Sequence, residues 1–249
     1  MPLNRRFITL TALVFSPLIT HQALAAIALD RTRVIYDGSE RSISLNISNE
    51  NKTLPYLAQS WLEDTQGKKV NSPLLVLPPV QRVEPGEKGA IKIQALPAAK
   101  TLPQDRESLF YFNLREIPPR SEKQNVLQIA LQTRIKLFYR PESIAISNKA
   151  DTTPAQNQLT LIQQGNDYKV TNPTPYYVTL VGASSSKATP SKDFKTVMIE
   201  PKSSATLNVN ATALGAHPVL TYINDYGGRP MLTFNCAGNA CKVAEGKNE

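Results

Sequence analysis

The chain has 249 residues, of which 41% are hydrophobic and 19% charged, and its formal net charge is +8. The hydrophobic share is enough to form folded cores. A basic balance can indicate nucleic acid or acidic membranes as partners, but here the basic residues are scattered, with no run longer than two, such as Lys68-Lys69. The charge therefore predicts a solvated basic surface and argues against nucleic-acid binding.

Residues 1–25 have the three parts of a secretory signal peptide. These are a basic start, an apolar stretch and a small-residue cleavage site, namely Arg5-Arg6, residues 7–19 and Ala23-Leu24-Ala25. The alternative is a membrane anchor, but the apolar run is shorter than the ~20 residues that span a bilayer and has Pro17 near its end. We predict export, with cleavage after about Ala25. The mature chain then suits one large β domain or two of ~100 residues.

Alternation of apolar and polar residues predicts strands along most of the mature chain. In chain order the expected strands are 42–49, 89–96, 108–117, 125–139, 157–164, 167–172, 176–184, 204–210 and 230–238. Turn signals such as DGS, EPGEKG, NPTP and DYGGRP lie between them. No segment has the pattern of a long amphipathic helix, and 19 prolines fit many short connections. Many strands with frequent turns indicate β-sandwiches.

The stretch NVLQIALQTRIKLFY (125–139) is about three times the usual strand length of ~5–6 residues. One face would carry Leu127, Ile129, Leu131, Thr133, Ile135 and Leu137, because side chains alternate across a strand. From the residues alone this pattern favours a long core strand, since an exposed apolar edge is an aggregation hazard. The charged, proline-bearing PPRSEK before it could serve to blunt such an edge.

The seam between two domains is expected at residues 139–156. There the long strand ends at a proline and polar residues accumulate. We therefore predict an all-β chain with an N-terminal sandwich at 26–144 and a C-terminal sandwich at 145–249.

The chain has two cysteines, Cys236 and Cys241, and in an oxidising compartment an even pair predicts a disulfide. Metal binding would need more ligands, and only His217 remains once the signal peptide is removed. No nucleotide-binding, metalloprotease or nucleophile-elbow motif is present. A hydrolase could rest only on His217, which lies in a connection, and the Glu63-Asp64 pair lies in a turn. We predict that the protein is not an enzyme and uses no cofactor.

Several long stretches resemble the periplasmic pilus-assembly chaperones, over nearly the whole mature chain. LPQDRESLFYFNLREIP (102–118) fits the signature of that family. The other stretches are LDRTRVIYDGSE (29–40), NKTLPYLAQSW (51–61), PPVQRVEPGEK (78–88), PPRSEKQNVLQIALQTRIKLFYRP (118–141), NPTPYYVTL (172–180) and TYINDYGGRP (221–230). The chain is most similar to the P-pilus (PapD-like) type. The resemblance implies two immunoglobulin-like domains in an L-shaped arrangement, with a binding cleft between them.

The resemblance also implies what the long strand is for. Pilus subunits of this system are sandwiches that lack their last strand, and the chaperone supplies one by strand addition. The donor here would be 125–133, with Leu127, Ile129 and Leu131 filling the groove of the subunit. The rest of the strand would belong to the chaperone's own first domain.

A second implied device is a pair of cleft bases that hold the C-terminal carboxylate of the subunit. The matching positions are Arg33 and Lys136, and strict alternation places Lys136 on the face opposite the donor side chains. An anion in a recessed site needs charge-assisted hydrogen bonds, worth ~1.5–3 kcal/mol each. Arg31 and Arg134 are the neighbours most easily confused with this pair.

A third implied feature is an ion network of Glu107, Arg140 and Asp225 that fixes the angle between the domains. Glu107 lies in the first predicted domain, Arg140 at the seam and Asp225 in the second domain. Buried networks of this kind set geometry more than stability.

The short loop before residue 125, with no cysteines around it, resembles the short-loop branch of the family. The family implies pilus subunits (pilins and the tip adhesin) and an outer-membrane usher as partners, and a periplasmic location. The sequence leaves open whether free molecules cap each other's donor strands as a homodimer. The rival hypothesis is a pilin or adhesin with a sandwich fold. Such a subunit should have an N-terminal donor extension, whereas this chain starts its first strand almost at once and ends in the polar KVAEGKNE.

Overall fold

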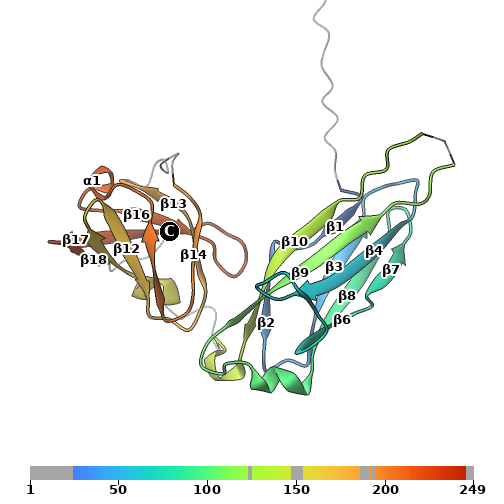
Figure 1. The fold of residues 1–249 in the computed structure, drawn as a ribbon, viewed down its shortest axis with the longest axis horizontal. Coiled ribbons are helices and arrows are strands. Elements are labelled where there is room, and N and C mark those ends of the chain that lie inside the picture. Colours follow the sequence, from blue (N-terminus) through green and yellow to red (C-terminus); the bar gives the residue numbers. More distant parts are fainter. Residues whose placement is uncertain (1–24, 123–124, 147–153, 186–190, 192–193, 245–249) are drawn as a thin grey trace, which may run out of the picture.

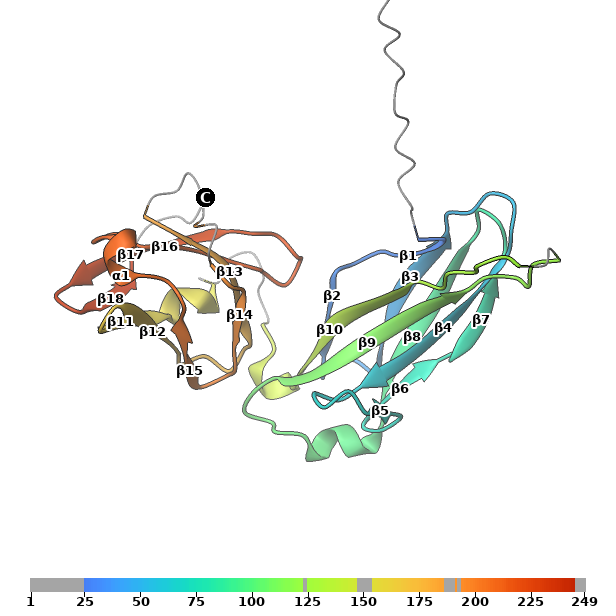
Figure 2. The ribbon, with the colours of Figure 1, turned by 45° about the horizontal axis from the view of Figure 1, so that its top comes forward.

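The structure is a computed structural model that describes residues 25–122, 125–146, 154–185, 191 and 194–244. The predicted signal peptide, apart from Ala25, lies outside the described residues, as does the middle of the predicted seam (147–153). Two β units are joined at one end, near the start of β9 and the end of β10, so that the molecule is bent (Figures 1 and 2).

The first unit is a sandwich of two sheets (Figure 1). One sheet has the order β1-β3-β8-β6, with bounds Ile27–Leu29, Ser42–Asn49, Lys88–Ala95 and Leu74–Leu77. The other has the order β2-β10-β9-β4-β5, with β7 beside β4. Its bounds are β2 Arg33–Asp37, β10 Gln132–Arg140, β9 Ser108–Ile117, β4 Tyr56–Glu63, β5 Lys69–Val70 and β7 Val80–Val83. Alternation sends one face of each sheet into a shared core that includes Tyr36, Leu45, Ile91, Phe112 and Leu137.

The second unit is built on one eight-stranded sheet with the order β14-β13-β16-β17-β18-β11-β12-β15. The bounds are β14 Val197–Ile199, β13 Val178–Ser184, β16 Val219–Tyr222, β17 Met231–Ala237, β18 Ala240–Val243, β11 Thr160–Gln164, β12 Asp167–Asn172 and β15 Ser203–Leu207. Its two end strands, β14 and β15, contact each other, so the sheet closes around a second core. That core includes Leu161, Tyr168, Val170, Leu180 and Phe234.

In the parts of the chain that the structure describes, helical structure is limited to short segments. These are the 3-10 turns Pro97–Thr101, Glu142–Ile144 and Ala155–Gln158 and the α-helix α1, Ala211–Leu214, which Asn210 caps. Within the described parts of the chain, no helix has the length and apolar character needed to cross a membrane.

The two-domain, all-β prediction is confirmed. β3, β9 and β12 have the predicted bounds, and β8, β13, β15 and β17 lie close to theirs. The expected strand 157–164 is wrong at its start, because residues 155–158 form a 3-10 turn and β11 begins only at Thr160.

The expected strand 125–139 is also wrong in its first half, since β10 begins at Gln132. Leu131 still accepts a hydrogen bond from the backbone N–H of Glu116 at 3.0 Å. Beyond this point β9 ends at Ile117, and Pro118-Pro119 has no N–H groups to continue the ladder. Residues 125–131 therefore extend past the end of the sheet without a paired strand among the described residues (Figure 2).

The predicted disulfide is present. Cys236 and Cys241 are directly opposite each other in the β17–β18 hairpin and are bonded. Cys241 is buried in the second core, and the hydroxyl of Tyr168 lies against both sulfur atoms.

Replacing both cysteines with serine is expected to cost about 2 kcal/mol, because a bond that closes so short a loop removes little entropy from the unfolded chain. Thermal unfolding of the oxidised and Cys236→Ser/Cys241→Ser proteins should differ by several degrees. Thiol labelling provides the control. Two free thiols in the unreduced, unfolded periplasmic protein would contradict the staple role.

Candidate functional site

The outer face of β10 leads from open surface to the junction of the two units. Ile135, Leu137 and Tyr139 point into the first core. The alternate residues of β10 face away from that core, namely Gln132, Arg134, Lys136, Phe138 and Arg140. At the junction, the ring of Phe138 lies 5.5 Å from the ring of Tyr177 in the second unit. The second unit thus covers one end of this face and leaves the other open.

Arg33 and Lys136 are brought together on this outer face. β2 runs parallel to β10, and the two residues are register partners. Both side chains are half-buried, and neither forms an ion pair with a carboxylate among the described residues. Arg33 Nη1 donates to the carbonyl of Ile223 at 3.4 Å, whereas its buried Nε has no described hydrogen-bond partner. Two half-buried cations with free donors therefore lie side by side.

The electrostatics of this pair favour a bound anion. Burial lowers the pKa of both Arg33 and Lys136, and the charge of Arg33 lowers the pKa of Lys136 further. For Arg33, the nearby carboxylates of Asp225 and Glu107 act in the opposite direction. An incoming carboxylate would stabilise both positive charges, because an opposite charge at close range favours the ionised form.

The two neighbouring arginines are already paired. Arg31 Nε lies 2.7 Å from Asp30 Oδ1, and Asp30 raises the pKa of this guanidinium. Arg134 Nε lies 3.0 Å from Glu63 Oε2, and its guanidinium lies 3.5 Å from the centre of the Tyr111 ring. Both arginines form an ion pair with a carboxylate, which separates them from Arg33 and Lys136.

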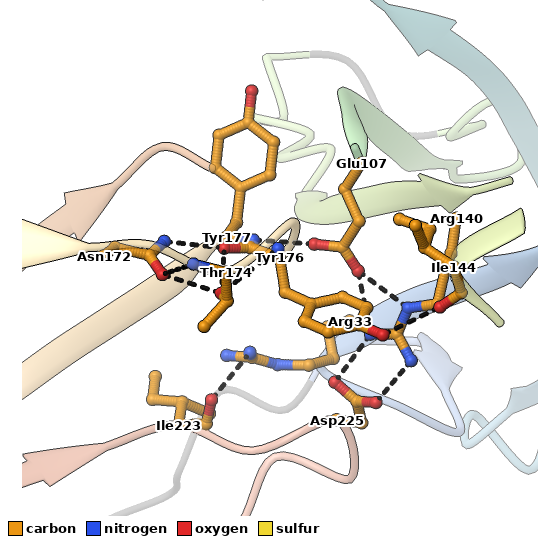
Figure 3. Close-up of polar contacts among 10 residues, drawn as sticks. All are labelled: Arg33, Glu107, Arg140, Ile144, Asn172, Thr174, Tyr176, Tyr177, Ile223 and Asp225. Carbon is orange, nitrogen blue, oxygen red and sulfur yellow. Dashed lines mark hydrogen bonds and ion pairs between the residues drawn. The ribbon is translucent and has the colours of Figure 1, made fainter. Parts of the chain in front are cut away.

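Glu107, Arg140 and Asp225 meet at the junction (Figure 3). Arg140 Nη2 lies 2.8 Å from Glu107 Oε1, and Nη1 lies 2.9 Å from Asp225 Oδ2. The other oxygen of Glu107 accepts the backbone N–H of Tyr177 at 2.7 Å. Burial opposes the charge on Arg140, but the facing carboxylates outweigh it and raise the pKa of the guanidinium. The network ties the ends of β9 and β10 to the second unit.

The row of inward apolar side chains on β10 continues before the strand begins, outside the sheet β2-β10-β9-β4-β5. Leu127 is 84% exposed, Ile129 66% and Leu131 41%, whereas Ile135 and Leu137 in the same row are buried. These side chains are exposed on residues 125–131, which have no neighbouring strand among the described residues. Such a segment is a template for pairing with another chain.

The sequence interpretation missed Glu116, which lies in β9 beside the point where the exposed segment 125–131 passes into β10. Its buried carboxylate accepts the backbone N–H of Ile27 at 2.9 Å and that of Leu131 at 3.4 Å. It therefore connects the first strand of one sheet to the start of β10 in the other. The available signal was its inward position in β9, in the same row as Phe112 and Leu114.

Glu116→Ala should lower the free energy of unfolding by ~1–3 kcal/mol, because it leaves two backbone donors unsatisfied. Glu116→Gln keeps an acceptor oxygen and should lose less. Urea unfolding of the three proteins measures both differences. Equal midpoints for wild type and Glu116→Ala would show that the carboxylate does not hold this junction.

Comparisons with known proteins show which family this chain resembles. The family model described as "Pili and flagellar-assembly chaperone, PapD N-terminal domain" matches residues 26–145, and "Pili assembly chaperone PapD, C-terminal domain" matches residues 154–234. The chain is 54% identical over 228 residues to the chaperone protein PapD of Escherichia coli, covering 90% of this chain and 92% of that protein. It is 44% identical over 224 residues to the chaperone protein PmfD of Proteus mirabilis, covering 88% of this chain and 87% of that protein.

Solved structures of pilus chaperones are also similar to this chain. The Pseudomonas aeruginosa CupB2 chaperone superposes with a TM-score of 0.68 and 31% identity, covering 84% of this chain and 100% of that chain. The Salmonella enterica SafA pilin in complex with the SafB chaperone provides a chain with a TM-score of 0.69 and 26% identity, covering 87% of this chain and 99% of that chain.

Proposed function

The chain belongs to the family of pilus-assembly chaperones, and from this premise we propose that it binds pilus subunits in the periplasm through an exposed donor segment and a carboxylate anchor. It is a chaperone and not an enzyme, and the family excludes the rival hypothesis of a structural pilin. One observation carries the proposed mechanism. The exposed apolar row 127–131 leads into β10, where Lys136 lies beside Arg33 of β2, and neither cation forms an ion pair among the described residues.

The two parts have different tasks. Leu127, Ile129 and Leu131 would each contribute ~1.5–3 kcal/mol on burial in a groove of the subunit, in addition to backbone hydrogen bonds. Two charge-assisted bonds to one carboxylate contribute less in total, but they fix where the bound chain ends. A strand slipped by one residue would turn its apolar side chains to the wrong face. The anchor therefore sets the register, and the strand supplies most of the affinity.

The remaining assignments rest on the family. The protein hands its complexes to an outer-membrane usher, and free molecules hide their donor segments from solvent in a self-capping homodimer. Export precedes these steps, with cleavage after about Ala25. The domains are 26–144 and 145–249, which the matched ranges 26–145 and 154–234 support.

Co-purification from periplasm tests the function. A tagged chaperone should recover pilus subunits, identified by mass spectrometry, and should be absent from assembled fibres. A synthetic peptide with the C-terminal sequence of a recovered subunit should bind as the free acid more tightly than as the amide by at least the ~10–150-fold that one charge-assisted bond of ~1.5–3 kcal/mol supplies. Recovery of the protein within fibres, or without any subunit, would contradict the proposal.

A further inference from the structure

The connection between β16 and β17 reaches from the second unit to the first. Residues 223–230, orange-red in Figure 1, extend toward β2 and β10. Asn224 holds this loop in one closed conformation. Its Oδ1 accepts the backbone N–H of Tyr226 at 3.1 Å and that of Gly228 at 2.8 Å, and its backbone N–H donates to the Gly228 carbonyl at 3.0 Å. The loop is therefore preorganised by its own hydrogen bonds.

The loop contacts the first unit at three points. The carbonyl of Ile223 accepts from Arg33 Nη1, and Asp225 pairs with Arg140 (Figure 3). Gly227 is packed against Thr32, because a Cβ built on it would lie 2.7 Å from Thr32 Oγ1. Its φ of +84° also favours glycine. Two of these three contacts are therefore to the consecutive residues Thr32 and Arg33.

Arg33 belongs to the first unit but is hydrogen-bonded to the second. The Ile223 carbonyl occupies one of its donors, while its buried Nε has no described partner. Both oxygens of Asp225 accept from Arg140, at 2.9 and 3.2 Å, so this carboxylate is held by Arg140 and does not form an ion pair with Arg33. A long arginine side chain loses conformational freedom on binding, and holding it in place beforehand reduces that loss.

We propose that the loop 223–230 is a positioning element that holds Arg33 ready for the terminal carboxylate of the bound subunit. The second domain then takes part in recognising the chain end although the donor segment and both cations belong to the first. This inference rests on the proposed function. The competing explanation is that the loop only joins the domains. In that case its disturbance would change stability or all binding alike, and not the preference for a free carboxylate.

Gly227→Ala tests the proposal, since the added methyl group would lie 2.7 Å from Thr32 Oγ1 at a φ of +84° that strains alanine, so the contact between the loop and Thr32 must change. Gly238→Ala is the matched control, because Gly238 also has a positive φ, +64°, but an added Cβ there meets nothing within 4 Å. Binding is measured for one synthetic peptide with the C-terminal sequence of a co-purified subunit, as free acid and as amide. We expect Gly227→Ala to reduce the acid-to-amide affinity ratio by about 10-fold or more, as losing one charge-assisted bond would. The affinity for the amide should change little, and Gly238→Ala should keep the wild-type ratio.

Two further variants make the result specific. Thr32→Ala/Gly227→Ala removes the hydroxyl that the new methyl group meets and should restore part of the ratio. If Gly227→Ala is recovered unfolded, Asn224→Ala, which removes the loop's side-chain hydrogen bonds without adding bulk, takes its place. A wild-type ratio in the folded loop variant would overturn the inference and leave the anchor intact. An equal loss in Gly238→Ala would also overturn it. A wild-type protein that does not distinguish acid from amide would overturn the anchor itself.

Discussion

Arg33→Ala and Lys136→Ala are each expected to abolish productive subunit capture, although the donor side chains remain. Removing one cation deletes a charge-assisted bond worth ~1.5–3 kcal/mol, or about 10–150-fold in affinity, and releases the constraint that sets the register of the added strand. The measurement is recovery of pilus subunits from periplasm by each tagged variant.

Arg31→Ala and Arg134→Ala are the matched controls, because both arginines lie close by on the same unit but are paired with Asp30 and Glu63. They should capture subunits normally. If all four variants behave alike, general basic charge is responsible and the specific anchor does not exist. Ile129→Asp should fail in a different way, weakening capture while leaving any remaining complex in register.

Arg140→Ala is expected to have the largest effect on the free protein. It leaves the carboxylate of Glu107, 3% exposed, buried beside Asp225 with no counter-charge from Arg140. Removing one member of a buried ion pair typically costs ~3–5 kcal/mol. We expect lower periplasmic levels, a lower urea midpoint, an altered angle between the domains by small-angle scattering, and loss of subunit binding as a consequence.

Arg106→Ala provides the comparison, since Arg106 pairs with Asp105 near the same junction but is exposed to solvent. An exposed pair of this kind contributes little, so this variant should resemble wild type. Wild-type stability and scattering for Arg140→Ala would refute the structural role of the network.

The accuracy of the sequence prediction followed how each strand is buried. β3, β9 and β12 alternate clearly between apolar and polar residues, and their bounds were predicted correctly. β4 was missed because its inward positions include Ala58 and Ser60, while Trp61 lies on the outer face. Ser60 is accommodated inside because its hydroxyl donates to the carbonyl of Pro78. The very short strands, such as β5 and β14, have too few residues to show a period.

The candidate site was harder to predict from local pattern. Arg33 and Lys136 are neighbours only because β2 and β10 pair in parallel across about a hundred residues of sequence, and no spacing in the chain expresses that pairing. The family resemblance selected them, and the geometry then distinguished them from Arg31 and Arg134. The break at Leu131 could have been anticipated, because Pro118-Pro119 ends the partner strand.

The division of residues 125–140 at Leu131 gives two halves of one continuous segment different evolutionary freedom. A substitution in 132–140 alters the chaperone's own core or its domain junction. Selection therefore acts on such a substitution mainly through the stability of the chaperone itself. A substitution at Leu127 or Ile129 leaves the fold nearly untouched, because both side chains are already in water. The proposed donor half can therefore change together with the grooves of the subunits, and a duplicated gene could bind new subunits without first losing a stable fold.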